Sequence, residues 1–191
     1  MIAAPPGWGP WTRRTWISSI VSYSVALPLG AIIVATLLYL AGRSIGHLPL
    51  VGVGAVALAS AAVGSTRLVD RLSTSRWQIP RSWARFGHTA YAALFGGILG
   101  LGVITVTPSI GFYTLVAWAL AAQWHDVWPV FLAFGGVRAL PLLFVAVRAQ
   151  RRRENPNLLL ERFRIVPVLA LPVEIVLLAA IGLLLIATAG L

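Results

Sequence analysis

The chain has 191 residues, of which 59% are hydrophobic and only 10% are charged. A soluble domain of this length cannot hide so much apolar surface, because it must also cover itself with polar groups. The composition therefore excludes an ordinary soluble domain and predicts an integral, multi-pass membrane protein with a single membrane domain over residues 1–191. The absence of cysteine excludes disulfides, thiolate metal sites and dithiol chemistry within the chain.

Apolar stretches recur along the whole chain, so we expect the first to be a true span and not a cleaved signal peptide. Spans of about 20 residues cross a bilayer as helices, because lipid offers no partner to the backbone. We predict an all-α, polytopic helix bundle with five net transmembrane spans. The spans are 16–41, 48–66, 89–122, 127–147 and 165–191, and the third is too long for one straight helix.

The charges give the orientation. All 15 basic residues are arginines, and all but Arg43 and Arg138 lie before the first span or in the loops 67–88 and 148–164. The positive-inside rule then places the N-terminus and both basic loops in the cytoplasm and the C-terminus outside. This orientation requires the stretch 89–122 to cross only once in net terms. The loop arginines that we expect to set topology and contact anionic lipid are Arg76, Arg81, Arg85, Arg151, Arg152 and Arg153.

The net charge of +10 is explained by this topology, so no nucleic-acid partner is expected. The segment RWQIPRSW at 76–83 alternates arginine with tryptophan and could be mistaken for a platform on which bases stack. Next to a span, Trp77 and Trp83 fit better at head-group depth, with Trp124 and Trp128 as the matching belt on the outer side.

The third stretch contains a glycine-rich run, GGILGLG, at residues 96–102. Small residues on one side of a membrane helix let another helix approach closely, so this face predicts helix packing. Its members are Gly96, Gly97, Gly100 and Gly102.

The same stretch is then interrupted at VTPSIGFY, residues 106–113. Pro108 removes a backbone donor and clashes with the carbonyl four residues earlier, and Gly111 permits a further departure from helical geometry. The hydroxyl of Ser109 can re-satisfy a freed carbonyl. We predict a helix broken at Pro108-Ser109. It is either a simple proline kink or a break facing a cavity, as transporters use at binding sites.

The segments GGILGLGVITVTPSIGFYTLVAWALAAQ and VFLAFGGVRALPLLFV resemble the second half of the transmembrane thiol-reductant carriers, the DsbD/CcdA family, over residues 85–148. Members show a glycine-rich helix, a Pro-Cys break and a following helix with a Leu-Pro element. Pro108-Ser109 stands at the Pro-Cys position and Leu140-Pro141 at the Leu-Pro element. The resemblance implies two inverted three-helix halves that pass reducing equivalents through a pair of cysteines.

This chain departs from that pattern in two ways. Ser109 stands where a cysteine would act, and a hydroxyl can neither form nor relay a disulfide. Only two spans precede the central basic loop, so the first broken helix would be missing with its cysteine; the ALPL sequence at 26–29 and again at 139–142 is a weak echo of the two halves. We therefore interpret the chain as a degenerate, cysteine-less relative that cannot perform dithiol chemistry.

Two ionisable residues lie deep in the predicted spans. Arg138 and Glu174 each lie roughly 14 to 15 Å from the cytoplasmic surface, from the rise per residue of a helix. An unpaired charge there costs at least about 2.5–3.5 kcal/mol. We predict an Arg138–Glu174 intramembrane pair, which either locks two helices together or takes part in transport or proton relay.

Enzyme and metal signatures are lacking. His125 and Asp126 in QWHDVW are adjacent and fall short of a metal site, and there is no phosphate-binding loop, paired-carboxylate or nucleophile-elbow motif. We expect no enzyme activity, no catalytic residues, no cofactor and no metal.

The sequence therefore predicts a non-catalytic integral membrane subunit, accessory protein or scaffold of a membrane complex in a bacterial-type plasma (inner) membrane. Its expected partners are the lipid bilayer and another membrane protein or a second copy of the chain. The alternative is a small-solute or ion transporter that uses the broken third helix and the Arg138/Glu174 pair. Redox assistance with cysteines supplied by a partner has no positive sequence feature.

Overall fold

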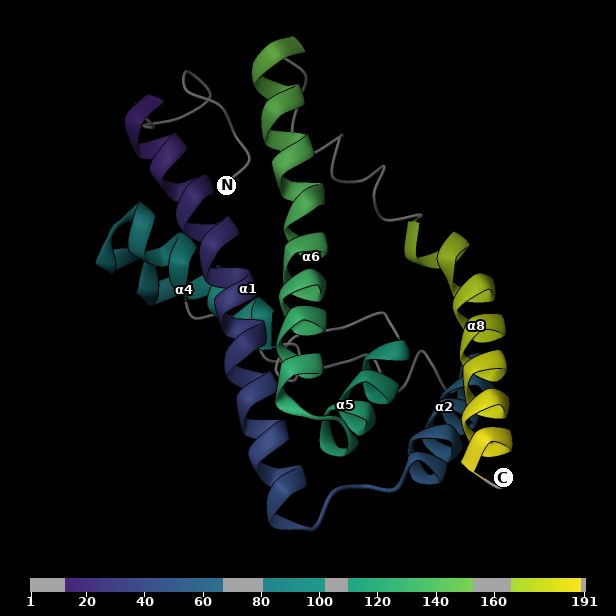
Figure 1. Cartoon of the computed structure of the whole chain (residues 1–191). Helices are drawn as coiled ribbons and strands as arrows, with labels where there is room; N and C mark the ends of the chain where they lie inside the picture. The colour runs from purple at the N-terminus through teal and green to yellow at the C-terminus, as the bar shows by residue number, and fades with distance from the viewer. Residues whose placement is uncertain (1–12, 67–80, 102–109, 153–165, 190–191) are drawn as a thin grey trace. The chain divides into compact units, whose positions relative to one another are not determined.

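The structure is a computed structural model that describes residues 13–66, 81–101, 110–152 and 166–189. Within these ranges every regular element is helical, which confirms the predicted all-α class (Figure 1). The elements are α1 (Arg13–Ser44), α2 (Leu50–Gly64), the 3-10 helix η1 (Arg81–Phe86), α4 (His88–Leu101), α5 (Gly111–Ala121), α6 (Trp124–Arg152) and α8 (Val166–Ala189).

Three of these helices, α1, α6 and α8, are long and apolar enough to cross a membrane. They correspond to the first, fourth and fifth predicted spans, with α8 described over Val166–Ala189 of the span 165–191. Helix α6 continues past the predicted span end and into the predicted loop 148–164. Its last turns carry Ala149, which is buried next to Val145 one turn earlier on the same helix, so the buried side of α6 continues beyond the predicted apolar stretch.

The other α-helices are shorter. Helices α2, α4 and α5 have 15, 14 and 11 residues, which correspond to lengths of about 22, 21 and 16 Å at the rise of an α-helix. A hydrocarbon core is about 30 Å thick. The third apolar stretch thus contains two helices on either side of residues 102–109. Gly102, Pro108 and Ser109 lie outside the described residues, so the position of the break stays a prediction.

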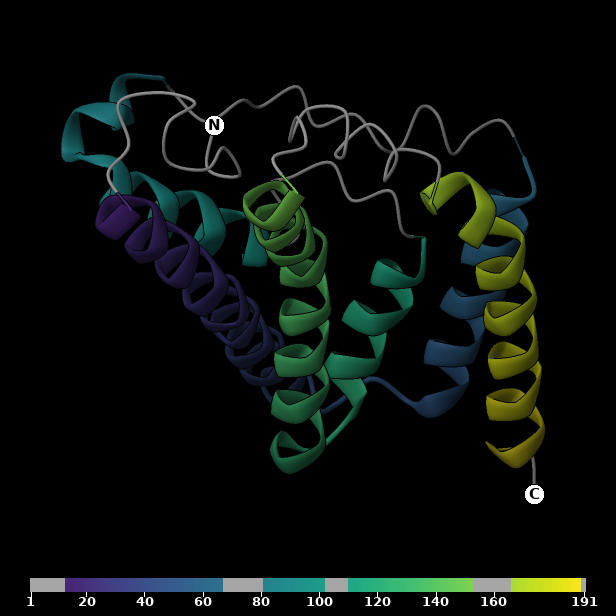
Figure 2. The same ribbon diagram turned by 90° about the horizontal axis from the view of Figure 1, so that it is seen from above.

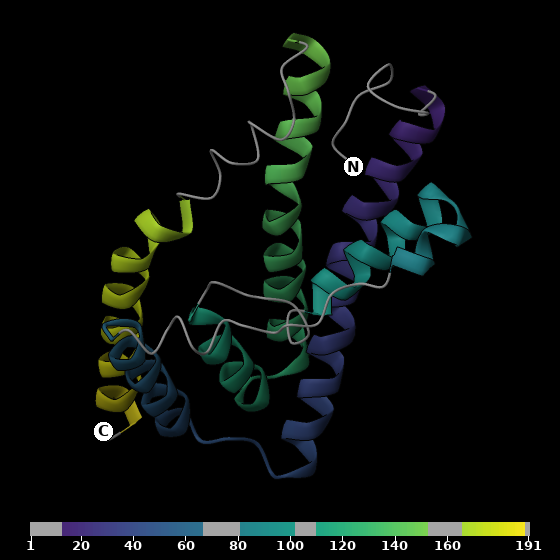
Figure 3. The same cartoon turned by 180° about the vertical axis from the view of Figure 1, so that it is seen from behind.

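The contacts within the chain form two compact units. The first contains α1 up to Ile33, η1, α4, and α6 from Val130 onward. In this unit α4 crosses α1, as Figures 1 and 3 show. The core of the unit is made by buried side chains of α1, α4 and α6: Trp16, Ile20, Tyr23, Leu27, Ala92, Ala139 and Ala146.

The second unit contains the rest of α1, the first turn of α6, and helices α2, α5 and α8. Helix α2 lies along α8 (Figure 2) and also packs against α5. The α2–α8 contact is close because Gly54 and Gly182 face each other. A Cβ on Gly54 would lie 3.0 Å from the Gly182 carbonyl oxygen, and a Cβ on Gly182 would lie 2.9 Å from the Gly54 oxygen.

The turn between α1 and α2 also belongs to the second unit. Gly46 and His47 have φ values of 84° and 61°, and the left-handed region at Gly46 is one that glycine adopts without steric cost. The backbone N–H of His47 donates to the Gly42 carbonyl at 2.7 Å, and that of Leu48 donates to the Leu120 carbonyl at 3.2 Å. The turn is therefore tied to the end of α5.

Candidate functional site

Helix α5 begins at Gly111, directly after the predicted break. Its N-cap residue, Ile110, has no polar side chain, and no side-chain hydrogen bond caps the helix from that position. Instead the backbone N–H of Gly111 donates to Oε1 of Glu174 on α8, at 2.6 Å. A carboxylate from another helix thus takes the place of a capping side chain, which normally comes from the residue before the first turn.

Packing fixes this contact from three helices of the second unit. Ile110 is buried and packs with Ala61 of α2 and Leu178 of α8. Gly64 of α2 makes room for it, because a Cβ there would lie 2.5 Å from Ile110 Cδ1 and 3.0 Å from Ile175 Cγ1. The start of α5 therefore lies against α2 and α8, next to the carboxylate that binds its first N–H.

This arrangement offsets part of the cost of placing Glu174 in an apolar region. A negative charge at a helix N-terminus contributes about 0.3–1 kcal/mol at a surface and up to about 2 kcal/mol where it is partly buried. A hydrogen bond to a charged group contributes about 1.5–3 kcal/mol. Glu174 is partly buried, so the structure gives the carboxylate a stabilising partner within its own unit.

Arg138, the other predicted intramembrane charge, belongs to the first unit. Its guanidinium carbon lies 5.3 Å from the centroid of the Phe134 ring, one turn earlier on α6. Its Nη1 atom is buried and has no hydrogen-bond partner among the described residues. The predicted Arg138–Glu174 pair joins residues of two separate units and stays a prediction.

The glycine-rich stretch of α4 meets α1 within the first unit. A Cβ on Gly96 would lie 2.5 Å from the Tyr23 carbonyl oxygen, and one on Gly100 would collide with the Leu27 carbonyl oxygen. Gly97 differs, since the nearest atom to a Cβ there, the Ala26 carbonyl oxygen, is 4.0 Å away. Its carbonyl oxygen instead occupies the space beside Gly30 of α1. The contact is thus made by glycines of both helices.

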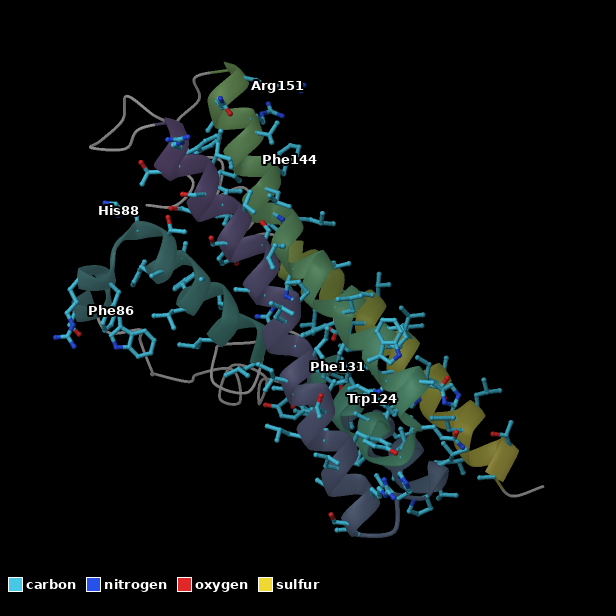
Figure 4. The ribbon with its side chains drawn as sticks, turned by 60° about the vertical axis from the view of Figure 1, so that its left-hand side comes forward. Phe86, His88, Trp124, Phe131, Phe144 and Arg151 are labelled. Atoms are coloured by element: carbon cyan, nitrogen blue, oxygen red, sulfur yellow. The ribbon has the colours of Figure 1, made fainter. Side chains whose placement is uncertain are left out.

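The predicted cytoplasmic arginines divide into those that are described and those that are not. Arg85 places its guanidinium carbon 5.0 Å from the centroid of the Phe86 ring. Arg151 is exposed and lies in the last turn of α6, where Figure 4 labels it. Arg81 lies in η1 and Arg152 ends α6. Arg76 and Arg153 lie outside the described residues.

The described residues contain no metal-binding cluster. His125 Nε2 and Asp126 Oδ1 are 3.5 Å apart, and both side chains are exposed. In the ranges that the structure covers, no group of three or more His, Asp or Glu side chains is arranged to hold a metal ion.

Sequence reasoning missed several glycines at which another part of the chain approaches closely. Gly30 and Gly135 of the first unit are close-packing positions: a Cβ on Gly135 would lie 2.6 Å from Pro28 Cα. Gly64 has the same role in the second unit. Single glycines in apolar helices could have marked them, because a small residue in such a helix often lies where another backbone approaches.

Comparisons with known proteins found no matching family model, no matching curated protein and no matching solved structure.

Proposed function

We propose that the chain is a non-catalytic integral membrane subunit that binds another membrane protein as a scaffold or accessory chain. The observation that carries this proposal is the uncovered surface of α8. Only 11% of the most apolar 18-residue window within Leu171–Ala189 is buried inside the structure. Its outward side chains are large and apolar, and they are open to van der Waals contact with a partner helix or with lipid. They include Val173, Val176, Leu177, Ile181, Leu183 and Leu184.

The cysteine-less composition supports the same proposal. A relative of the thiol-reductant carriers without its two cysteines would keep the glycine contact between α1 and α4 and lose the reaction. A chain with one helix fewer than a symmetric bundle would also leave helix surface uncovered. Under the proposal, a partner helix covers α8.

In this proposal the protein crosses a bacterial-type inner membrane five times in net terms. Helices α1, α6 and α8 each cross once, the predicted span 48–66 crosses once with α2 as its helical part, and α4 and α5 together cross once. The N-terminus and the loops 67–88 and 148–164 lie in the cytoplasm. Large apolar side chains on the outward face of α1 support contact with lipid: Ile17, Val21, Val25, Leu29 and Ile33.

Cysteine labelling tests this orientation directly, since the chain has no cysteine of its own. Gln123→Cys and Gln150→Cys place exposed thiols near the two ends of α6. In intact cells we expect a membrane-impermeant maleimide to label Gln123→Cys. The same reagent should leave Gln150→Cys unmodified until the membrane is opened. Labelling of both variants in intact cells would contradict the orientation.

Purification in a mild detergent tests the proposed function. We expect a stoichiometric membrane-protein partner to co-purify with the chain. Leu177→Ala/Leu184→Ala should reduce its recovery about tenfold if the two truncations together remove about 1.4 kcal/mol of binding free energy. The matched control is Ile17→Ala/Val21→Ala on α1, which should retain the partner.

A transporter is the second candidate, and the contact between Glu174 and Gly111 favours it. Discontinuous membrane helices in transporters direct a helix N-terminus toward an anionic group near the bilayer centre. Here a helix that starts after a predicted break directs its first N–H at a carboxylate. A homogeneous homo-oligomer without a partner, with thermal stability that depends on a small solute, would support transport and contradict the scaffold proposal.

A further inference from the structure

Arg138 brings a positive charge into a unit whose described residues hold no negative one. The described part of the first unit covers residues 13–33, 81–101 and 130–152, and these ranges contain no aspartate or glutamate. A charge in an apolar helix bundle is costly unless a partner of opposite sign compensates it. Within these ranges the charge of Arg138 has no carboxylate to pair with.

The neighbours of Arg138 orient the guanidinium without neutralising it. The Phe134 ring lies on one side, with its centroid 5.3 Å from the guanidinium carbon, and an aromatic face attracts a cation. The side chain of Tyr23 on α1 lies within electrostatic range of Arg138. Nη1 remains buried without a hydrogen-bond acceptor among the described residues. The arginine is thus held in place while one donor stays available.

A second available group lies at the same level on α1. Gly135 of α6 approaches Pro28 of α1 to 2.6 Å from the ideal Cβ position to Pro28 Cα. The two helices run in opposite directions in this unit, as Figures 1 and 3 show. A residue one turn after Gly135 on α6 therefore lies at the same height along the helix pair as a residue one turn before Pro28 on α1. Arg138 and Ser24 occupy these two positions.

Ser24 adds a hydroxyl with unused hydrogen-bonding capacity. Its Oγ is buried and has no partner among the described residues. A guanidinium and a hydroxyl at one level supply the donors that an oxyanion accepts, and arginine binds carboxylate and phosphate oxygens through its paired N–H groups.

We propose that the α1–α6 seam at Arg138 binds a small oxyanion, a phosphate or carboxylate group, with Arg138 supplying the charge and Ser24 donating a hydroxyl hydrogen bond. The group could belong to a free anion or to a lipid headgroup, which share this chemistry. The inference goes beyond the proposed scaffold function and does not depend on it.

Thermal unfolding of the purified chain in a neutral detergent tests the site. Inorganic phosphate and acetate are titrated separately, each against sodium chloride at the same ionic strength. We expect a saturable rise in the unfolding temperature with at least one of the two oxyanions, because a ligand that binds only the folded state stabilises it in proportion to its occupancy. The proposal is wrong if chloride raises the unfolding temperature as much as the oxyanions do. It is also wrong if neither the free oxyanions nor phosphatidylglycerol in nanodiscs raises it.

Variants locate the response. Arg138→Gln should abolish it, whereas Arg148→Gln should keep it, since Arg148 lies over Phe144 on the same helix in the same spacing, 5.9 Å from the ring centroid. Ser24→Ala tests the site without removing a charge. It should raise the dissociation constant of the oxyanion about five- to tenfold, which corresponds to the loss of one hydrogen bond. If Arg138→Gln does not fold, an unchanged affinity in Ser24→Ala would overturn the site.

Nanodiscs distinguish the two sources of the oxyanion. If phosphatidylglycerol stabilises the chain more than phosphatidylcholine does, if Arg138→Gln removes this difference, and if free phosphate and acetate have no effect, the site binds a lipid headgroup. Stabilisation by the free anions in both lipids assigns it to a soluble ligand. If Glu174→Gln creates an oxyanion response that the parent chain lacks, Glu174 is the counter-ion of Arg138 and the proposal is wrong.

Discussion

Replacing Gly100 by alanine should separate α1 from α4 and lower the stability of the first unit by about 1–3 kcal/mol, the usual cost of overpacking a closed contact. The added Cβ would collide with the Leu27 carbonyl oxygen and would lie 2.9 Å from the Leu27 carbonyl carbon and 3.0 Å from the Ala31 nitrogen. All three are backbone atoms, which cannot rotate away as a side chain can. Gly96→Ala should behave in the same way, because its Cβ would lie 2.5 Å from the Tyr23 carbonyl oxygen.

Gly97→Ala is the matched control for this prediction. It is the same substitution on the same helix, between the two contact glycines, and its Cβ would find its nearest neighbour at 4.0 Å. Alanine also favours a helix over glycine by up to about 1 kcal/mol, so this variant should be as stable as the parent or slightly more so. The measurement is thermal unfolding in detergent, followed by circular dichroism. Equal stability of Gly97→Ala and Gly100→Ala would show that α4 does not approach α1 through this face.

The fold class was predictable because hydropathy and length dominate in a membrane. A run such as 127–147 has one stable form in lipid, a helix, and α6 covers it. The helix ends were less predictable, since α6 continues to Arg152 and buries Ala149 in a segment that charge counting assigned to a loop. The division of the chain into two units was not predicted either. It separates α4 from α5, two helices that the sequence reads as parts of one apolar stretch.

The partners of the buried charges were less accessible to sequence reasoning. Arg138 and Glu174 were paired in the prediction because their depths match and their charges are opposite. The structure gives Glu174 the backbone N–H of Gly111, a donor that nearly every residue possesses and that no residue type marks. One signal was present, however. Ile110 precedes the helix with no polar side chain, so it offers no side-chain acceptor to the first turn of α5.

Glu174→Leu should release the start of α5. The variant removes the acceptor of the Gly111 N–H and leaves that donor unsatisfied in a partly buried, apolar place. A hydrogen bond to a charged group contributes about 1.5–3 kcal/mol, so exchange of the Gly111 amide with solvent deuterium should accelerate roughly ten- to hundredfold. Glu174→Gln keeps an acceptor oxygen and loses the charge, so we expect a smaller acceleration. Amides of α4, in the other unit, serve as the internal control and should be unchanged.

Arg138→Leu in the same exchange experiment separates capping from ion pairing. If the carboxylate is held chiefly by the start of α5, the Gly111 amide keeps its protection when Arg138 is removed, and the double variant Arg138→Leu/Glu174→Leu exchanges like Glu174→Leu alone. If Arg138 orients the carboxylate, Arg138→Leu deprotects Gly111 as well, and the two losses in the double variant fall well short of additive. The first result leaves Arg138 without Glu174 as its counter-ion, which is what binding of an oxyanion at the α1–α6 seam requires. The second assigns the charge to the predicted intramembrane pair, so one set of variants decides between the two roles of the buried arginine.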